Sequence, residues 1–500
     1  MPVVLPSQFS NVLDTCKSPL AWLIFICLFY HVANAEARPN ILLIVSEDNG
    51  PELGCYGDRF VKTPNLDRLA SQGTRFENAF VPQSGCSQSR AALLTGLYPH
   101  QNGQIGLATW KFAMYRANTP NIVRQLKESG YRTGILGKLH VNPATAFPFD
   151  MHEIESSNFS RKKLKAYASR AADFMRASDE PFFLSVNYPD AHRPFTKQVG
   201  KLPEQPLSGD DVKPLSYFGL DSPELRSDTA NYYNCMSRLD SLVGDLLAEL
   251  NQSGKKDNTL IVYMGDHGAD LLRGKRTCFE GGLRVPLLIK QPGNGAAGQV
   301  RRELVSTLDI APTLLQIANA DPIKNLPGES LLPLLNGESV RWREYLFAEY
   351  HLHSAHNFYP QRCVRNGRYK LIQNLQPKSV DPGFAFTLNR FFPGIQQIIE
   401  NAPIHVRNAY HRMQAPPEYQ LYDLKEDPYE FQNLVNNAMY SDVFIRLKSK
   451  LAEWREQTND PLLKAAKLQR LKTEIQSCLK NGTPSKSALN LTYSHYFFEP

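Results

Sequence analysis

Residues 40–50, NILLIVSEDNG, contain the stretch of sequence that decides the fold. The run Asn40–Ser46 is dominated by consecutive aliphatic residues and lacks the polar alternation of a half-exposed strand, which is typical of a strand buried on both faces. Glu47 and Asp48 follow it at once. The stretch therefore predicts a central strand of a covered sheet, with acidic side chains at its carboxyl end.

The same pattern recurs further along the chain, at residues 131–137 (YRTGILG), 181–188 (PFFLSVNY) and 259–264 (TLIVYM). These runs are followed by Lys138 and His140, by Asp190 and His192, and by Asp266 and His267. A polar residue after one strand is usually a loop residue. Here four strands are each followed by residue types that bind metals or transfer protons, which favours a functional site.

Helical patterns separate these runs, at residues 64–72, 119–129, 164–177 and 230–251. Alternating strands and helices predict an α/β fold with a mostly parallel sheet. Open α/β sheets bind ligands beyond the carboxyl ends of their strands. We therefore expect the polar residues that follow the four runs to converge on one site.

A fifth segment, GCSQSRAALLTGLYP at residues 85–99, predicts a helix that starts near Cys86 and is closed by Gly96. A helix N-terminus presents free N–H groups and a positive dipole end, which lower the pKa of a thiol and attract anions. Arg90 lies one turn further on the same face. An ordinary buried cysteine is the alternative interpretation.

Composition excludes several classes of protein. The chain has 500 residues, of which 42% are hydrophobic and 21% charged, with a net charge of +7. These values rule out a collagen, a coiled-coil rod and a wholly disordered chain. The mild basic excess is compatible with an anionic partner without identifying one.

The N-terminal residues predict a targeting segment. The apolar run LAWLIFICLF at residues 20–29 is too short to span a bilayer comfortably, and the small-residue pattern Ala33-Asn34-Ala35 follows it. We expect residues 1–35 to be a secretory signal peptide, with an uncleaved signal anchor as the alternative. The expected location is exported: periplasmic, secreted or lysosomal, depending on the source.

The motifs together resemble the type I sulfatases of the alkaline phosphatase superfamily. Cys86-Ser87-Gln88-Ser89-Arg90 with Leu94-Thr95-Gly96 resembles the family signature C-x-P-S-R with L-T-G, and Gly137-Lys138-Leu139-His140 resembles G-K-x-H. Gly265-Asp266-His267-Gly268, Gly274-Lys275 and the segment around Tyr422-Asp423-Leu424 resemble later motifs. Residues 134–141, 148–150, 100–103 and 368–375 are similar to the heparan N-sulfatase branch of the family.

The resemblance implies an alkaline-phosphatase-like (sulfatase) α/β fold with a mostly parallel sheet flanked by helices and a smaller C-terminal α+β domain. We expect the catalytic domain at residues 38–370, the C-terminal subdomain at 371–475 and a tail at 476–500 to which we assign no function. Strands are expected at residues 369–374 and 420–424, and a packed helix at 442–457.

The resemblance also implies a mechanism. A maturation enzyme would convert Cys86 to formylglycine, whose hydrate is both nucleophile and metal ligand. Arg90, Lys138 and Lys275 would neutralise the sulfate oxygens. His140 would hold or deprotonate the hydrate, and His192 would protonate the leaving group.

The implied metal site consists of Glu47, Asp48, Cys86, Asp266 and His267. Oxygen ligands suit calcium, which we expect, but the family's usual residues at two positions are replaced by Glu47 and His267. Because imidazole suits transition metals, manganese and zinc remain alternatives. A third departure is Gln88, which stands where the signature has proline and leaves the maturation of Cys86 open.

The function implied is an exported sulfohydrolase acting on sulfated glycans, with N-sulfoglucosamine of heparin- or heparan-type substrates as the expected target. His353, His356 and Arg362 lie in a segment similar to the same branch and are expected to bind substrate. The alternatives are an O-sulfatase on another sulfated polysaccharide and a non-catalytic glycan-binding pseudo-sulfatase. A phosphatase or phosphonate hydrolase of the superfamily is a weaker option. The expected partners are the sulfated glycan and the maturation enzyme. We expect no nucleic-acid partner and no stable membrane span, and a homodimer is left open.

The basic run Arg161-Lys162-Lys163 with Lys165 is a further candidate feature. Most runs of this kind are solvated helix faces, and docking of a polyanion is the alternative.

Overall fold

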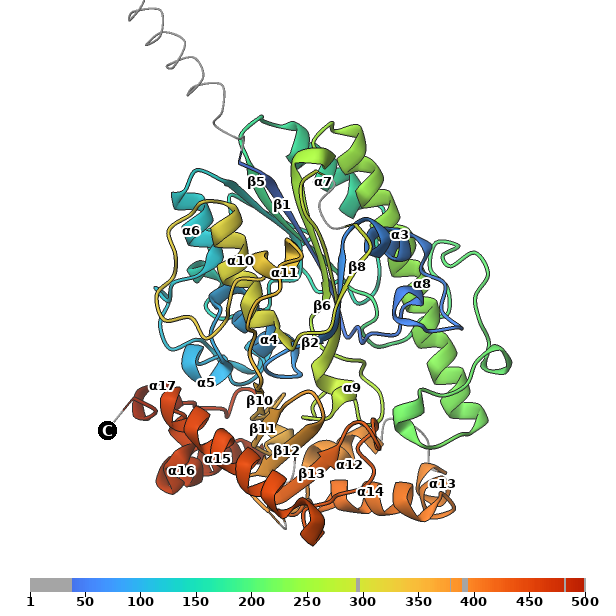
Figure 1. Ribbon diagram of the computed structural model, residues 1–500, viewed down its shortest axis with the longest axis vertical. Coiled ribbons are helices and arrows are strands. Elements are labelled where there is room, and N and C mark those ends of the chain that lie inside the picture. Colours follow the sequence, from blue (N-terminus) through green and yellow to red (C-terminus); the bar gives the residue numbers. More distant parts are fainter. Residues whose placement is uncertain (1–37, 294–296, 378, 389–393, 481–482, 499–500) are drawn as a thin grey trace, which may run out of the picture. The chain divides into compact units, whose positions relative to one another are not determined.

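A nine-stranded sheet forms the centre of the fold (Figure 1). It belongs to a computed structural model that describes residues 38–293, 297–377, 379–388, 394–480 and 483–498. The signal peptide expected at residues 1–35 lies outside the described residues. Among the helices that the structure describes, none combines the length and apolar composition needed to cross a bilayer.

The sheet has the strand order β4-β3-β5-β1-β6-β7-β2-β8, with β9 beside β2. The strands are β1 (Asn40–Ser46), β2 (Thr74–Phe80), β3 (Arg132–Gly137), β4 (Met151–Glu153), β5 (Phe182–Tyr188), β6 (Thr259–Gly265), β7 (Arg284–Lys290), β8 (Gln299–Arg301) and β9 (Val305–Ser306). Every neighbouring pair is parallel except those that β7 makes with β6 and β2. The expectation of a mostly parallel sheet is confirmed.

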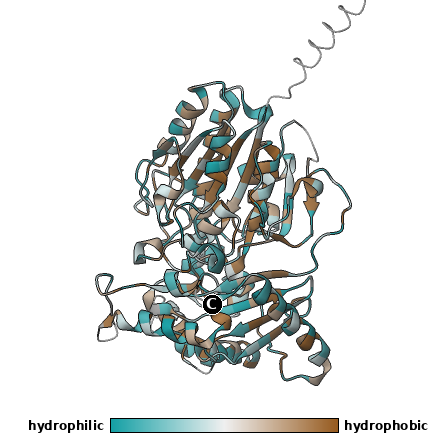
Figure 2. Cartoon of the chain, turned by 90° about the vertical axis from the view of Figure 1, so that its left-hand side faces the viewer, coloured by the Kyte–Doolittle hydropathy of each residue, from teal (hydrophilic) through white to brown (hydrophobic). Residues whose placement is uncertain are grey.

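Helices cover both faces of this sheet (Figure 1). On one side lie α3 (Pro64–Gln72), α7 (Ala166–Arg176) and α8 (Pro223–Gln252); on the other lie α4 (Cys86–Thr95), α6 (Ile122–Glu128) and α10 (Ile310–Ile317). Figure 2 shows apolar residues concentrated in the strands between them, where Ile41–Val45 are almost completely buried. Continuous burial explains why these strands lack polar alternation.

Helix α8 begins before the expected residue 230. The hydroxyl of Ser222 accepts a hydrogen bond from the amide of Leu225, and Pro223 occupies the first helical position. Both features are favoured at helix N-termini, because the capped amide and the missing proline N–H would otherwise be unpaired. The helix thus starts at its capping residue, upstream of its clearest apolar periodicity.

A smaller antiparallel sheet follows, with the order β10 (Leu346–Tyr350), β11 (Gln361–Arg365), β12 (Tyr369–Asn374) and β13 (Tyr419–Asp423). Helix α15 (Ser441–Gln457) packs on β11 and β12. The boundary expected between residues 370 and 371 falls inside β12, so two strands of this sheet come from the part expected to be catalytic. The remaining elements are α5 (Pro99–Asn102), α9 (Glu280–Leu283), α11 (Leu332–Leu335), α12 (Pro382–Leu388), α13 (Ile395–Glu400), α14 (Ile404–Gln414), α16 (Ala465–Ser477), β14 (Leu479–Lys480), β15 (Thr483–Pro484) and α17 (Tyr493–Tyr496).

The described part of the C-terminal tail is anchored to the segment that follows α5. The hydroxyl of Tyr493 lies 2.9 Å from the carbonyl oxygen of Gly103 and accepts a hydrogen bond from the amide of Ala113 at 2.9 Å. Tyr493 and Phe497 also belong to an apolar cluster with Phe112. The tail is therefore part of the packed structure.

Candidate active site

The carboxyl ends of β3, β5, β1 and β6 meet at one edge of the large sheet, because these four strands are adjacent and parallel. Glu47 and Asp48 follow β1, and Asp266 follows β6. The amide of Asp48 donates to Asp266 Oδ1 at 2.9 Å, and the amide of Glu47 donates to the carbonyl oxygen of Asp190 at 3.0 Å. The expected convergence of these loops is confirmed.

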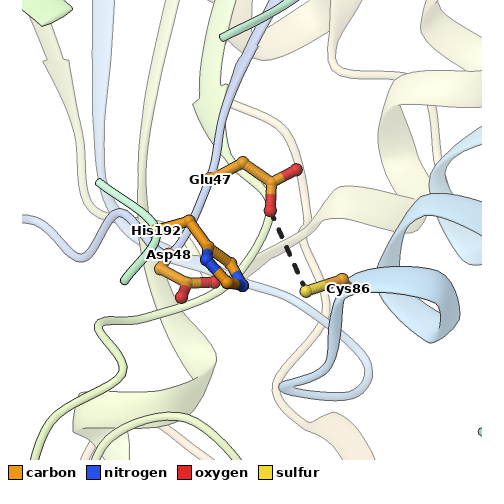
Figure 3. Close-up of side chains that lie close together, drawn as sticks. All are labelled: Glu47, Asp48, Cys86 and His192. Atoms are coloured by element: carbon orange, nitrogen blue, oxygen red, sulfur yellow. Dashed lines mark hydrogen bonds between the residues drawn. The ribbon is translucent and has the colours of Figure 1, made fainter. Parts of the chain in front are cut away.

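Cys86 is the first residue of α4 and faces this edge (Figure 3). Its Sγ lies 3.3 Å from Lys275 Nζ, 3.4 Å from His267 Nε2 and 3.9 Å from Glu47 Oε2. The residue is only 2% exposed. Burial alone would raise the pKa of the thiol, but Lys138 and Lys275 outweigh it and hold the pKa below its usual value. The site therefore favours a negatively charged group at this position.

Three buried carboxylates are paired with three cations. Arg90 donates from Nη2 to Glu47 Oε1 at 2.5 Å and from Nε to Asp266 Oδ2 at 3.2 Å. Lys138 Nζ lies 2.8 Å from Glu47 Oε2, and Lys275 Nζ lies 2.8 Å from Asp48 Oδ1. Burial would raise the carboxyl pKa values, yet nearby positive charge keeps each pKa below its usual value: chiefly Lys138 and Arg90 for Glu47, Lys275 for Asp48, and His267 and Arg90 for Asp266. The carboxylates are thus ionised and able to bind a cation.

The donor atoms around Cys86 fit a divalent metal. Potential ligand atoms of Glu47, Asp48, Cys86 and His192 lie within 4.8 Å of one another, and so do those of Cys86, Asp266 and His267. Asp48 Oδ2 is buried and has no hydrogen-bond partner among the described residues. The carboxylates favour calcium, and the imidazole of His267 favours manganese or zinc.

His267 is oriented for such a role. Its Nδ1 lies 2.9 Å from the carbonyl oxygen of Gly268, which can only accept, so Nδ1 carries the proton and Nε2 faces the carboxylates. Burial lowers its pKa, but Asp266 and Asp48 outweigh this and raise the pKa to about 9. A position that holds a proton so firmly also attracts a metal cation.

His140 and His353 present imidazoles beside this charged cluster. Both nitrogens of His140 and Nδ1 of His353 are buried without a hydrogen-bond partner among the described residues. Burial lowers the pKa of both well below the usual value, and Lys138 (for His140) and Lys275 (for both) lower it further. These neutral rings can exchange hydrogen bonds with a substrate. The side chain of His356 lies outside the described residues.

His192 completes the group drawn in Figure 3. Its Nδ1 donates to the carbonyl oxygen of Arg193 at 2.5 Å, and its ring stacks on Phe159 at 3.6 Å between centroids. The preceding Asp190 is held by Arg161 Nε at 2.6 Å and Arg238 Nε at 2.7 Å. The ring is thus fixed with Nε2 as the nitrogen free to transfer a proton.

Arg161 is therefore not part of a solvated basic face, because its guanidinium is buried against Asp190. Lys162, Lys163 and Lys165 are exposed, as expected for solvated residues. The difference between Arg161 and the lysines could not be predicted from the basic run, because the partner Asp190 lies 29 residues further along the chain.

Arg362 is not brought to the site. It is fully buried, and its guanidinium donates twice to the carboxylate of Asp460, at 2.8 Å each. Glu349 Oε2 lies 3.6 Å away. The structure does not place Arg362 where it could contact substrate. Its guanidinium nitrogens are all hydrogen-bonded to protein groups: Asp460, His351 and the carbonyl oxygen of Gln361.

Other contributors were not singled out from the sequence. Asn187 Oδ1 accepts from Arg90 Nη1 at 2.6 Å, and Phe159 supports both His192 and Lys138, whose Nζ lies 5.0 Å from the ring centroid. Asn187 is the second-last residue of β5. It could have been found by including polar residues just before the end of each strand as well as those that follow it. Phe159 carries no such signal.

Gln88, the departure from the signature, is anchored to two backbone carbonyls. Its Nε2 donates to Leu352 O at 2.6 Å and Ile105 O at 3.3 Å. Gln83 Nε2 reaches the same oxygens at 3.3 and 3.4 Å. Gln88 therefore ties the first turn of α4 to the segment that carries His353.

Comparison with known proteins agrees with this geometry. A family model described as Sulfatase matches residues 39–320, more than half of the chain, and one described as N-sulphoglucosamine sulphohydrolase, C-terminal, matches residues 265–381. The chain belongs to the sulfatase family. The resemblance seen in the sequence and the expectation of a sulfatase enzyme are confirmed.

Individual relatives support the same assignment. This sulfatase is 33% identical to human N-sulphoglucosamine sulphohydrolase over 478 residues, which cover 85% of the chain and 92% of the human protein. It is 29% identical to a protein named Ulvan-active sulfatase from Formosa agariphila, covering 83% of the chain and 74% of that protein. A structure solved with its substrate D-glucosamine-2-N,6-O-disulfate aligns with a TM-score of 0.61 at 22% identity, covering 85% and 98% of the two chains. The expected fold class is confirmed.

We predict that this sulfatase binds a divalent metal at the site and that Asp266→Ala abolishes the binding, because it deletes one carboxylate and leaves Arg90 partly unpaired. Elemental analysis after dialysis should find metal in the wild type and none in the variant. Asp245→Ala, an exposed acid on α8, is the matched control. Full turnover after exhaustive chelation would exclude a metal site, and re-addition of calcium, manganese or zinc identifies the ion.

We predict that Gln88→Ala lowers the free energy of unfolding by about 1–3 kcal/mol, because the carbonyls of Leu352 and Ile105 lose their better donor. The thermal midpoint should fall for Gln88→Ala and Gln88→Glu, neither of which can donate, and stay unchanged for the exposed control Gln457→Ala. An unchanged midpoint in both Gln88 variants would show that the two carbonyls do not need this amide.

Proposed function

We propose that this sulfatase is an exported sulfohydrolase that removes sulfate from sulfated glycans, with the N-sulfated glucosamine of heparin- or heparan-type chains as its preferred target. The observation that carries the proposal is the 33% identity to human N-sulphoglucosamine sulphohydrolase over nearly its whole length. The match to that protein's C-terminal family model supports it. The expected signal peptide at residues 1–35 supports export.

The proposed nucleophile is formylglycine formed from Cys86 by a maturation enzyme; its hydrate supplies the hydroxyl that attacks sulfur. The cysteine Sγ stands in for the hydrate oxygens. The position suits this chemistry, because Lys275 Nζ lies 3.3 Å from Sγ and the first turn of α4 adds its dipole. His140, whose ring nitrogens have no partner among the described residues, would orient or deprotonate the hydrate.

The residues proposed to hold a divalent metal are Glu47, Asp48, Asp266 and His267, together with the hydrate derived from Cys86. When bound, the metal would supply positive charge to the sulfuryl oxygens. Lys138 and Lys275 would add to the same field. Arg90 has a different part: its nitrogens are engaged by Glu47, Asp266, Asn187 and the carbonyl oxygen of Lys138, so it fixes the ligands in place.

His192 is proposed as the general acid for the leaving group. Its Nδ1 proton is held by the carbonyl oxygen of Arg193, so Nε2 is the nitrogen that delivers a proton to the departing amine or sugar oxygen. Stacking on Phe159 prevents the ring from turning away. His353, buried beside Lys275, is proposed to bind the sugar.

An O-sulfatase acting on another polysaccharide is the second candidate, favoured by the identity to the Ulvan-active sulfatase. The same machinery would serve it. A pseudo-sulfatase is motivated by Gln88 and Glu47, which depart from the family pattern.

We predict that Cys86 is formylglycine in the active protein. Mass spectrometry of the tryptic peptide 76–90 should show the change from a thiol-bearing to an aldehyde-bearing side chain when the host contains the maturation enzyme. Only unmodified cysteine in protein from a competent host would favour the pseudo-sulfatase or a direct role of the thiol.

We predict that His192→Ala lowers kcat/KM for a glucosamine N-sulfate by about 10²–10⁴, because a basic amine must be protonated as it leaves. An aryl sulfate, whose phenolate is already a stable anion, should lose much less. Lys138→Ala is the comparison variant and should affect both substrates alike, because it acts on the sulfuryl oxygens. Equal losses on both substrates for His192→Ala would remove its leaving-group role.

A further inference from the structure

A pocket of about 670 Å³, separate from the candidate active site, lies where α5 meets the C-terminal elements. Its walls include Tyr115, Asn459, Lys464, Lys467, Phe497 and Phe498. This volume is typical of small-molecule sites. The pocket contains part of the tail to which the sequence assigned no function.

The pocket is remote from Cys86. Cys86 starts α4, whereas α5 lies at its other end, where Asn102 Nδ2 donates to Thr95 Oγ1 at 3.3 Å. The ten residues of α4 span about 15 Å. In Figure 1, α5 and α17 lie together at one side of the structure, above α16. A ligand here would not occupy the catalytic site.

The pocket favours anions. Lys464 and Lys467 line the pocket; Lys464 is exposed, and Lys467 Nζ donates to the carbonyl oxygen of Phe497 at 3.0 Å, which holds its ammonium group at the wall. The acid Asp460 in the same wall is neutralised by Arg362 at 2.8 Å and Arg455 at 2.7 Å. Glu456 is the opposing exposed carboxylate. Among the described lining residues, Lys464 and Lys467 against Glu456 leave an excess of one positive charge beside the paired Asp460.

The aromatic residues of the pocket offer an apolar face beside this charge. Phe498 is 55% exposed, and its ring packs edge-on against Tyr115 with centroids 4.3 Å apart. The guanidinium of Arg116 lies 5.6 Å from the Phe498 centroid. A sugar ring combines an apolar C–H face with polar edges, so it can stack on Phe498 while Asn459 and Thr458 bond its hydroxyls.

We propose that this pocket binds a short segment of a sulfated oligosaccharide, as a second glycan site separate from the catalytic centre. Lys464 and Lys467 would bind sulfate groups, and Phe498 would stack on a sugar ring. Binding in this pocket involves no hydrolysis. It therefore does not depend on which sulfate group the active site removes. It would retain a polymeric substrate near the enzyme by a second contact.

A single-stranded nucleic acid also combines negative charge with stacking rings. We favour the saccharide because stacking sites for nucleic acids track several bases along an open groove, whereas this is one cavity with one exposed ring. A nucleic acid is therefore the competing outcome of the test.

The test uses the full-length chain with Cys86→Ala to prevent turnover, and a heparin-derived tetrasaccharide as the probe. Calorimetric titration should give a second binding event, and Lys464→Glu and Phe498→Ala should each weaken that event by roughly tenfold, about 1.4 kcal/mol. Lys472→Glu, on α16, which begins directly after Lys464, lies outside the pocket lining; it is the charge-matched control and should leave that event unchanged. An oligodeoxythymidylate of equal charge should bind more weakly.

Two further outcomes separate this proposal from the proposed function. With Cys86 intact, Lys464→Glu and Phe498→Ala should leave kcat/KM for a monosaccharide sulfate unchanged, even if that sulfate is not the N-sulfate. The absence of any binding event that Lys464→Glu and Phe498→Ala weaken, equal effects of Lys464→Glu and Lys472→Glu, or tighter binding of the oligodeoxythymidylate would overturn the second glycan site.

Discussion

The structure depends on burying three carboxylates at one point. Taking Glu47, Asp48 and Asp266 out of water costs several kcal/mol for each ion, and only close opposite charges can offset that cost. Arg90, Lys138 and Lys275 supply them at hydrogen-bonding distance. Each cation comes from a different segment, so the cluster holds together the ends of β1, β3 and β6, the N-terminal half of α4 and the loop before α9.

This arrangement explains why the loops at the sheet edge cannot vary freely. Arg90 bonds two carboxylates, the carbonyl of Lys138 and Asn187 at once. Gln88, two residues earlier, bonds the backbone on the opposite side, at Ile105 and Leu352. The first turn of α4 is thus fixed from both sides, and Cys86 is held at a defined distance from Lys275 and His267.

Local sequence predicted the elements well and distant partners poorly. The four buried strands ended where their apolar runs ended, because a strand buried on both faces cannot accept charges before its end. The start of α8 was missed, since capping by Ser222 acts upstream of the apolar periodicity. Arg362 was expected to bind substrate because its segment resembles one branch of the family, and nothing local pointed to its partner Asp460, 98 residues away. Arg161 was assigned to the surface because nothing local pointed to its partner Asp190, and the role of Phe159 depends on stacking that no spacing encodes.

The contact between the C-terminal tail and the segment after α5 can form only late in synthesis. Tyr493 bonds Gly103, 390 residues earlier, and the segment after Gly103 returns to Ser87, where the amide of Ala108 donates to Ser87 Oγ. At 5–20 residues per second, synthesis places these two parts roughly 20–80 s apart. During that interval the segment that contains Gly103, Ala108 and Ala113 lacks the tail that packs on it. The proposed conversion of Cys86 would therefore be easiest before Tyr493 and Phe497 pack against the segment that bonds Ser87.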